Sequence, residues 1–244
     1  MQKYLIKISF DGTDYHGWQV QPNGITVQES LQNAMTKLYG YAPDITGCSR
    51  TDAGVHAEEF YCHFSLDIDI CDCGIVAGLN SVLKDDIRVL SCKHIDKEFH
   101  CRYAAKRKTY IYKIDTRKIA DPFNARYSYH YPGPLDIRKM KIFCDSIVGV
   151  HDFEGFSSAN RSVKDTVREI FECNIDENDG FLTFSVTGNG FLYNMVRILV
   201  GTAIDVGNGR LNENIANEIF ETKNRAQGGF TAAAKGLFLK RVEY

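Results

Sequence analysis

The sequence has no long apolar run, and this limits what the protein can be. No stretch reaches the roughly 20 apolar residues of a membrane-spanning helix, and Met1-Gln2-Lys3 leads into alternating residues without a signal peptide. The chain also has no large excess of positive or negative charge, because 29 basic and 31 acidic residues give a formal net charge of −2. We therefore expect a cytoplasmic globular protein whose 244 residues form one large domain or two smaller ones.

Cysteine is plentiful, with 8 residues, but the spacing that would indicate a metal site is missing. Cys71 and Cys73 are too close for the usual zinc pair, and no His-x₃₋₅-His pattern follows them. Cys48, Cys62 and Cys144 lie among apolar residues and are expected to be small buried side chains. The sequence predicts no metal site and is typical of a reduced compartment.

Hydrophobic periodicity in the first 96 residues predicts the order β-α-β-β-α-β. Strands are expected at 4–10, around residue 45, at 59–66 and at 87–95, with His63 solvated on a polar face. A helix is expected after Thr26, where Glu29 completes a capping box, and another at 73–83. This order is that of ferredoxin-like and RNA-recognition modules.

The second half repeats the pattern loosely. Strands are expected at 109–114, 166–175, 181–187 and 236–242, and helices at 135–148, 191–206 and 211–221. The predicted fold is therefore α+β, with two ferredoxin-like, RNA-recognition-like halves whose antiparallel sheets join around a central basic cleft. We place the N-terminal domain at 1–105 and the C-terminal domain at 106–244.

Local charge is uneven. Residues 97–118 contain eight Lys or Arg and two acids, whereas residues 67–96 contain six acids and three basic residues. A concentrated basic segment suits a groove for a polyanion, although a solvated basic edge would look the same. Tyr110 and Tyr112 follow this segment, and basic residues interleaved with aromatics suit a phosphate track beside a base-stacking surface. Core tyrosines of a strand are the alternative.

Arg50 and Asp52 place a guanidinium and a carboxylate two residues apart, between two stretches that are expected to be strands. In extended chain they point to the same side, and Gly54 allows a turn after them. The pair is either a reactive centre or a surface ion pair. Arg197 lies inside an otherwise apolar helix, so burial would require a carboxylate or phosphate partner for it. Asp52 is one acid that could serve, and another acid is equally consistent.

Six motifs in this order resemble the tRNA pseudouridine synthase A (TruA) family over nearly the whole chain. The first three are Tyr15-His16-Gly17-Trp18-Gln19, the Arg50–Ala57 stretch that contains Arg50-Thr51-Asp52, and Phe99-His100-Cys101-Arg102 with Tyr110-Ile111-Tyr112. The others are His151-Asp152-Phe153, the glycine-bounded stretch 188–197, and the tail Thr231-Ala232-Ala233-Ala234-Lys235-Gly236-Leu237.

The resemblance implies a homodimer without a cofactor that converts uridine to pseudouridine in the anticodon stem-loop of tRNA, typically at positions 38 to 40. It implies that Asp52 is the catalytic aspartate and that Arg50 and Arg197 support it. Tyr110 would stack on the target base, and Leu237 would contact the other side of that base.

The chemistry leaves several routes open. A carboxylate could attack the sugar C1′ or the base C6, or could act as a base on the sugar. A paired base cannot enter such a pocket, so the nucleotide must be flipped out. Basic residues expected to contact phosphates are Arg102, Lys106, Arg107, Lys108 and Arg168.

Two positions depart from the family pattern. Ser49 stands where glycine is expected and Ala233 where proline is expected, which leaves open a paralogue with a different tRNA site preference. A non-catalytic RNA-binding module is an alternative that would not need Asp52. A glycoside hydrolase is another, but such enzymes usually need two carboxylates about 5–10 Å apart.

Overall fold

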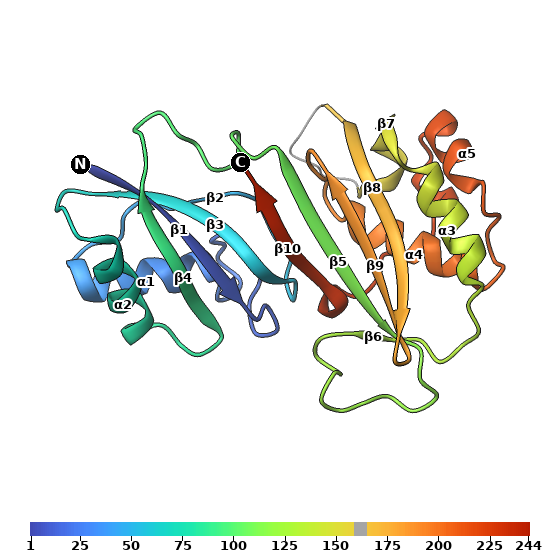
Figure 1. Ribbon diagram of the computed structural model, residues 1–244, viewed down its shortest axis with the longest axis horizontal. Coiled ribbons are helices and arrows are strands. Elements are labelled where there is room, and N and C mark those ends of the chain that lie inside the picture. Colours follow the sequence, from blue (N-terminus) through green and yellow to red (C-terminus); the bar gives the residue numbers. More distant parts are fainter. Residues whose placement is uncertain (159–164) are drawn as a thin grey trace. The chain divides into compact units, whose positions relative to one another are not determined.

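The computed structural model describes residues 1–158 and 165–244, which form two compact units (Figure 1). The first unit contains Met1–Lys106 and Phe238–Tyr244, and the second contains Arg107–Leu237. Both units combine helices with a mostly antiparallel sheet, which confirms the α+β class. The domain division at 1–105 and 106–244 stays a prediction. Within the described ranges no helix has both the length and the apolar character needed to cross a membrane.

The sheet of the first unit has the strand order of a ferredoxin-like module. Its central strands run β4-β1-β3, each antiparallel to its neighbour. The two ends of β3 take different partners, because β2 pairs with residues 62 and 63 and β10 pairs in parallel with residues 56 and 57. The strands are β1 (Gln2–Phe10), β2 (Thr46–Gly47), β3 (His56–Leu66), β4 (Ile87–His94) and β10 (Leu237–Glu243).

Two helices accompany this sheet. Helix α1 (Val27–Tyr39) begins after Thr26, whose hydroxyl accepts the Glu29 N–H at 3.2 Å, as the capping pattern predicted. Helix α2 (Asp72–Val82) packs against α1 and β4 (Figure 1). The alternating apolar residues of β1 are fully buried, so the predicted strand supplies part of the core of this unit.

The second unit is built around the strand order β5-β9-β8-β7, again antiparallel. Helix α3 packs against α4, α5 and β8 (Figure 1). The strands are β5 (Arg107–Asp115), β6 (Tyr129–His130), β7 (Gly149–Asp152), β8 (Val167–Asn178) and β9 (Phe181–Gly188). The helices are α3 (Ile137–Ser146), α4 (Met195–Gly207) and α5 (Ile215–Thr222), with 3₁₀ turns η1 (Phe153–Phe156), η2 (Arg225–Gln227) and η3 (Ala234–Gly236).

Helices α4 and α5 begin four residues later than predicted. Asn194 precedes α4 with a left-handed backbone (φ 59°), and the Met195 N–H donates to the Leu192 carbonyl, so residues 191–194 form a turn. Before α5, the Ile215 N–H donates to the Asn212 carbonyl and the Asn212 side chain accepts the Asn214 N–H. Asparagine favours such local turns over helix, which the apolar periodicity did not reveal.

The prediction that His63 is solvated was wrong. Its side chain is buried because the segment after β4 covers this part of β3, and the Cys101 N–H donates to His63 Nδ1 at 3.4 Å. Burial, with Lys3 and His100 nearby, lowers the pKa of His63 to about 4. Cys48, Cys62 and Cys144 are buried, as predicted.

Candidate active site

Asp52 lies in the loop of residues 48–55, which joins β2 to β3. The Val55 N–H donates to the Asp52 carbonyl at 3.1 Å, and Gly54 adopts φ 78°, so the chain turns directly after Asp52. Asp52 is partly exposed and Arg50 is exposed, and both side chains make interactions within the protein. The loop therefore presents a carboxylate and a guanidinium at the start of β3.

A second loop, residues 11–25, supports the Asp52 loop through backbone hydrogen bonds. The Trp18 N–H donates to the Thr51 carbonyl at 3.1 Å, and the Gly54 N–H donates to the Tyr15 carbonyl at 3.2 Å. A Cβ on Gly17 would lie 2.3 Å from the Thr51 carbonyl oxygen, and Gly17 has φ 82°. Gly17 is therefore needed for its backbone conformation and for this close approach.

Trp18 anchors the supporting loop in the core. It is buried and packs on Phe60 of β3, with ring centroids 4.3 Å apart. A Cβ on Gly47 would lie 2.6 Å from the Trp18 ring, so glycine at the end of β2 leaves room for the indole. The buried indole therefore holds the supporting loop against β3.

His56 was not singled out by sequence reasoning, although it lies within the Asp52 motif. Its ring is buried, with Nδ1 3.0 Å from the Gly12 nitrogen and 3.0 Å from Asp11 Oδ1. The ring stacks on Phe238 of β10 at a centroid distance of 4.6 Å. His56 thus joins β10 and the supporting loop to the first residue of β3, and the presence of histidine so close to Asp52 was the available signal.

The segment after β4 also contacts the Asp52 region. Arg102 Nε donates to the Gly47 carbonyl at 3.3 Å, and the Cys101 thiol donates to the Thr46 carbonyl at 3.1 Å. The motif Phe99-His100-Cys101-Arg102 therefore fixes β2, from which the Asp52 loop leaves. Arg102 has a structural partner in addition to any contact with a ligand.

Tyr110 and Tyr112 lie on β5 of the second unit. Tyr110 is 6% exposed and meets Phe191 edge to face, with ring centroids 5.1 Å apart. Tyr112 is fully buried, and its hydroxyl donates to the Ala233 carbonyl at 2.8 Å. Burial raises the pKa of Tyr112, with Arg197 acting in the opposite direction. The core-tyrosine interpretation is therefore correct for Tyr112.

Arg197 projects from the first turn of α4 and is partly exposed. Its Nε donates to the Ala232 carbonyl at 2.7 Å, and Nη1 donates to Asn194 Oδ1 at 2.8 Å. The Ala232 N–H in turn donates to the Arg197 carbonyl at 3.1 Å. Arg197 therefore holds the tail segment that leads to Leu237, and neutral oxygens are among its partners.

Leu237 follows η3 and is 5% exposed. A Cβ on Gly236 would lie 2.6 Å from the Tyr112 ring, so glycine is needed where the tail crosses this tyrosine. The next residue, Phe238, pairs with His56 in the sheet of the first unit. Arg197, Tyr112 and the residues before Leu237 thus form one connected group in the second unit.

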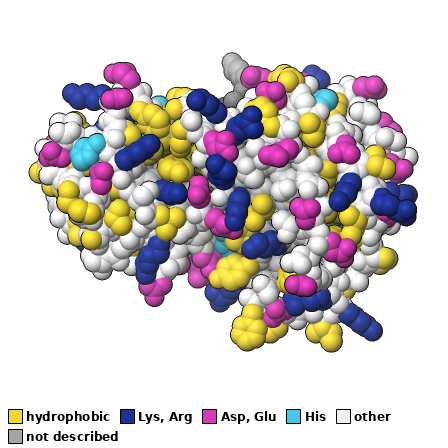
Figure 2. All heavy atoms as spheres, viewed as in Figure 1, with side chains coloured by type: hydrophobic (Ala, Val, Ile, Leu, Met, Phe, Trp, Pro, Cys, Tyr) yellow, Lys and Arg dark blue, Asp and Glu magenta, His cyan; other side chains and the backbone are white. Residues whose placement is uncertain are grey.

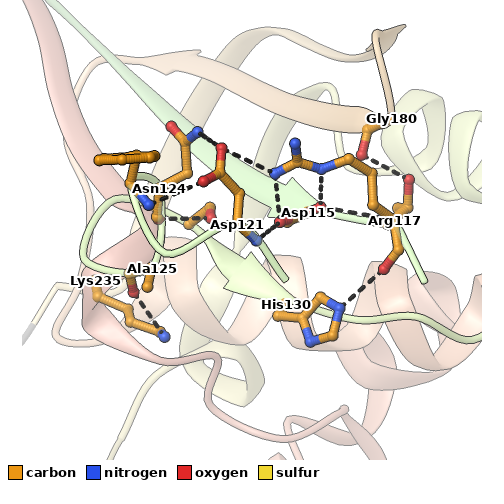
Figure 3. Close-up of polar contacts among 11 residues, drawn as sticks. Asp115, Arg117, Asp121, Asn124, Ala125, His130, Gly180 and Lys235 are labelled. Carbon is orange, nitrogen blue, oxygen red and sulfur yellow. Dashed lines mark hydrogen bonds and ion pairs between the residues drawn. The ribbon is translucent and has the colours of Figure 1, made fainter. Parts of the chain in front are cut away.

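A polar network supports the same tail (Figure 3). Lys235 Nζ donates to the Ala125 carbonyl at 2.9 Å, in the loop between β5 and β6. Arg117 Nε and Nη2 each donate to Asp115 at 2.8 Å, and Asp121 accepts from Asn124 at 2.7 Å. The hydrogen bonds from Arg117 lower the pKa of the buried Asp115 to about 2. This network fixes the loop to which Lys235 attaches.

The basic candidates differ in exposure. Lys106 and Arg107 are exposed, Arg168 is partly exposed, and Lys108 is buried with interactions inside the protein. The Arg107 guanidinium lies over the Phe171 ring, 4.5 Å from its centroid. Basic and acidic side chains are interspersed on the face drawn in Figure 2, in keeping with the small net charge.

The described part of the chain offers no group of three or more His, Cys, Asp or Glu side chains arranged to hold a metal ion. Asp52 lies in the first unit, whereas the second unit contains Tyr110, Arg197 and Leu237.

Comparison with known proteins identifies relatives along the whole chain. The family model described as "tRNA pseudouridine synthase" matches residues 143–244. The tRNA pseudouridine synthase A of a Thermoanaerobacter species (strain X514) is 41% identical over 244 residues, covering 100% of both chains. The protein of the same name from Latilactobacillus sakei is 40% identical over 246 residues, covering 100% of this chain and 99% of the relative. That of Streptococcus pneumoniae is 39% identical, with the same coverage.

Proposed function

The chain belongs to the tRNA pseudouridine synthase A family, and we propose that it isomerises uridine in the anticodon stem-loop of tRNA, at positions 38 to 40, with Asp52 as its essential carboxylate. The observation that carries the assignment of Asp52 is the construction of its loop. The loop of residues 11–25 holds the backbone at residues 51–54 through two hydrogen bonds and the close approach of Gly17, while the Asp52 side chain keeps access to solvent. Such support is what a reactive side chain needs for accurate placement.

In the proposed reaction Asp52 acts on the flipped-out nucleotide and the bond between sugar and uracil breaks. The uracil then rotates and rejoins through carbon, so no group is lost and no redox step is needed. A neighbouring cation keeps the carboxylate ionised, and Arg50 and Arg197 are proposed for this role. Guanidinium groups suit it because they do not lose their protons.

The detached uracil must be retained while it turns. We assign Tyr110 to one face of the base and Leu237 to the other, since an aromatic and an aliphatic surface allow rotation in the plane of the ring. Tyr110 is 6% exposed and Leu237 is 5% exposed, so each offers only a small apolar surface for contact with a base. Flipping the nucleotide out of the stem costs a few kcal/mol, which contacts to the RNA must offset.

Phosphate binding is assigned to basic residues at the start of β5 and near β8. Lys106 and Arg107 are the most exposed members and Arg168 is partly exposed, whereas Arg102 is held by the Gly47 carbonyl and Lys108 is buried. Each phosphate neutralised makes binding more dependent on salt. A homodimer, which the family resemblance implies, and a cytoplasmic location complete the proposal.

Asp52→Asn tests the central assignment, because it keeps the size of the side chain and removes its charge. We expect the variant to bind tRNA as the unchanged protein does and to release no tritium from tRNA labelled at C5 of uridine. Near-normal tritium release would refute the role of Asp52. Tritium release that is absent even from the unchanged protein, with tRNA binding intact, would instead indicate a non-catalytic RNA-binding module.

The same reaction also shows which uridine positions of the tRNA are modified. Pseudouridines are mass-silent but react with carbodiimide, so mapping them in tRNA incubated with the protein identifies the positions. Modification at 38 to 40 supports the assignment, and modification confined to other positions would identify a paralogue with a different preference. The glycoside hydrolase alternative would release free base or sugar from its substrate, which chromatography of the reaction mixture would reveal.

A further inference from the structure

We propose that Cys71 and Cys73 form a reversible thiol–disulfide pair, a modification site that the uridine chemistry does not use. Both side chains are exposed at the start of α2, and their sulfur atoms are 3.1 Å apart. A disulfide bond is about 2.05 Å long, so the two sulfurs must approach by about 1 Å to bond.

The backbone at Cys71 prepares its sulfur to carry negative charge. Cys71 is the N-cap residue of α2, with φ −60° and ψ 148°, and its Sγ accepts the Gly74 N–H at 3.3 Å. The N-terminus of a helix favours an anion, and a thiolate is such an anion. A Cβ on Gly74 would lie 3.2 Å from this sulfur, so glycine leaves the space that Sγ occupies.

The two thiols have different roles. The hydrogen bond from the Cys73 thiol, followed by that from the Gly74 N–H, lowers the pKa of Cys71. The same hydrogen bond raises the pKa of Cys73, which keeps its proton longer. Cys71 is therefore the nucleophilic thiolate and Cys73 the resolving thiol, the arrangement found in redox-active cysteine pairs.

The surroundings fix the pair and make it selective. His94 lies 3.0 Å from Asp72 through Nδ1 and 3.1 Å from Asp69 through Nε2, so it holds the start of α2 against β4. Three other cysteines of this unit, Cys48, Cys62 and Cys101, are buried. Burial and Asp72 raise the pKa of Cys92 to about 12, which keeps that thiol protonated. A small oxidant therefore meets Cys71 first.

The reaction with a peroxide balances in two steps. The Cys71 thiolate attacks one oxygen of hydrogen peroxide, the O–O bond breaks, and sulfenic acid and hydroxide form. The Cys73 sulfur then attacks the Cys71 sulfur, the S–O bond breaks, and the hydroxide that leaves takes the Cys73 proton to form water. The two sulfurs lose two electrons in total and the peroxide gains them, and a dithiol reverses the change by exchange.

Intact-protein and peptide mass spectrometry test the proposal on the full chain, reduced and then treated with hydrogen peroxide. We expect a loss of about 2 Da, reversed by dithiothreitol, with a peptide in which Cys71 and Cys73 are linked. Cys73→Ser should stop at a Cys71 sulfenic acid that dimedone traps. Cys71→Ser should slow the loss of exposed thiol about tenfold, and it keeps the helix start because serine is a favoured N-cap.

Cys92→Ser is the matched control, since it removes a thiol of the same region and should leave the linkage unchanged. Circular dichroism of each variant establishes that α2 and the sheet are retained. Three results would overturn the proposal: both thiols persist in the unchanged protein, Cys71→Ser loses about 2 Da as readily as the unchanged protein, or the linked peptide contains Cys92 in place of Cys71 or Cys73.

Discussion

Replacing Gly17 with alanine tests whether the supporting loop sets the position of Asp52. The added Cβ would lie 2.3 Å from the Thr51 carbonyl oxygen and 3.1 Å from the Asp52 carbonyl carbon. Ordinary non-bonded contacts are about 3.5 Å or longer, so the backbone next to Asp52 must move by about 1 Å. A displacement of that size in a catalytic group costs about 10²-fold in rate.

The expected result is a fall in the rate of tritium release of about 10²-fold, equivalent to about 2.7 kcal/mol of transition-state stabilisation. The affinity for tRNA should change little, because the phosphate contacts lie elsewhere. The free energy of unfolding should also fall, since alanine at φ 82° costs roughly 1–2 kcal/mol.

Gly40→Ala is a matched control for the loss of stability that alanine causes at a positive φ. Gly40 has φ 83°, almost the same as Gly17, but a Cβ there would meet nothing within 4 Å. It should therefore lose similar stability from backbone strain and keep its full rate. If Gly17→Ala releases tritium as fast as Gly40→Ala does, the supporting loop does not set the position of Asp52.

Three further changes test other parts of the structure. Asp115→Asn should lower the free energy of unfolding at pH 7 by about 2 kcal/mol. Because the pKa of Asp115 in the folded protein is depressed to about 2, the difference between the two proteins should shrink as the pH falls from about 4 towards 2. Urea unfolding across this pH range measures the difference, and an equal difference at all pH values would contradict the prediction. Ala233→Pro should raise the free energy of unfolding by about 0.5–1 kcal/mol, because Ala233 already has the φ of −58° that proline requires. Thermal or urea unfolding measures this change, and a destabilised variant would show that the proline ring does not fit. Tyr110→Phe should retain most tritium release if the ring acts by stacking, whereas Tyr110→Leu should not, and a Phe variant as inactive as Asp52→Asn would mean that the hydroxyl is essential.

Local patterns predicted the elements well where each depends on its own residues. The alternation in β1 and the cap at Thr26 are local features, and both occur where expected. The starts of α4 and α5 were placed too early because asparagine turns at 194 and 212 compete with helix, and apolar spacing does not register that competition. His63 was misplaced for a different reason, since its cover comes from residues near 101, far along the chain.

The candidate site likewise combines residues that a short stretch of sequence reveals with contacts that it does not reveal. Asp52, Arg50 and Gly54 could be singled out because their spacing and chemistry are visible in a short stretch of sequence. The position of His56 near Asp52 was visible in the sequence, but its contacts with Gly12 and Asp11 were not, because they join segments more than forty residues apart. The neutral partners of Arg197 at Ala232 and Asn194 were likewise invisible, since an apolar helix gives no sign of which segment crosses it.

The α+β class, the family and the identity of the reactive side chains could be inferred from the sequence, because periodicity and motif spacing follow from residues close together in the chain. The way in which those side chains are held depends on the folded structure. The Asp52 loop is fixed by backbone contacts with Tyr15, Gly17 and Trp18, and the tail before Leu237 is fixed by Tyr112, Arg197 and Lys235. These contacts depend on which distant segments the folded sheets bring within hydrogen-bond distance, and a hydrogen bond exists only at that distance.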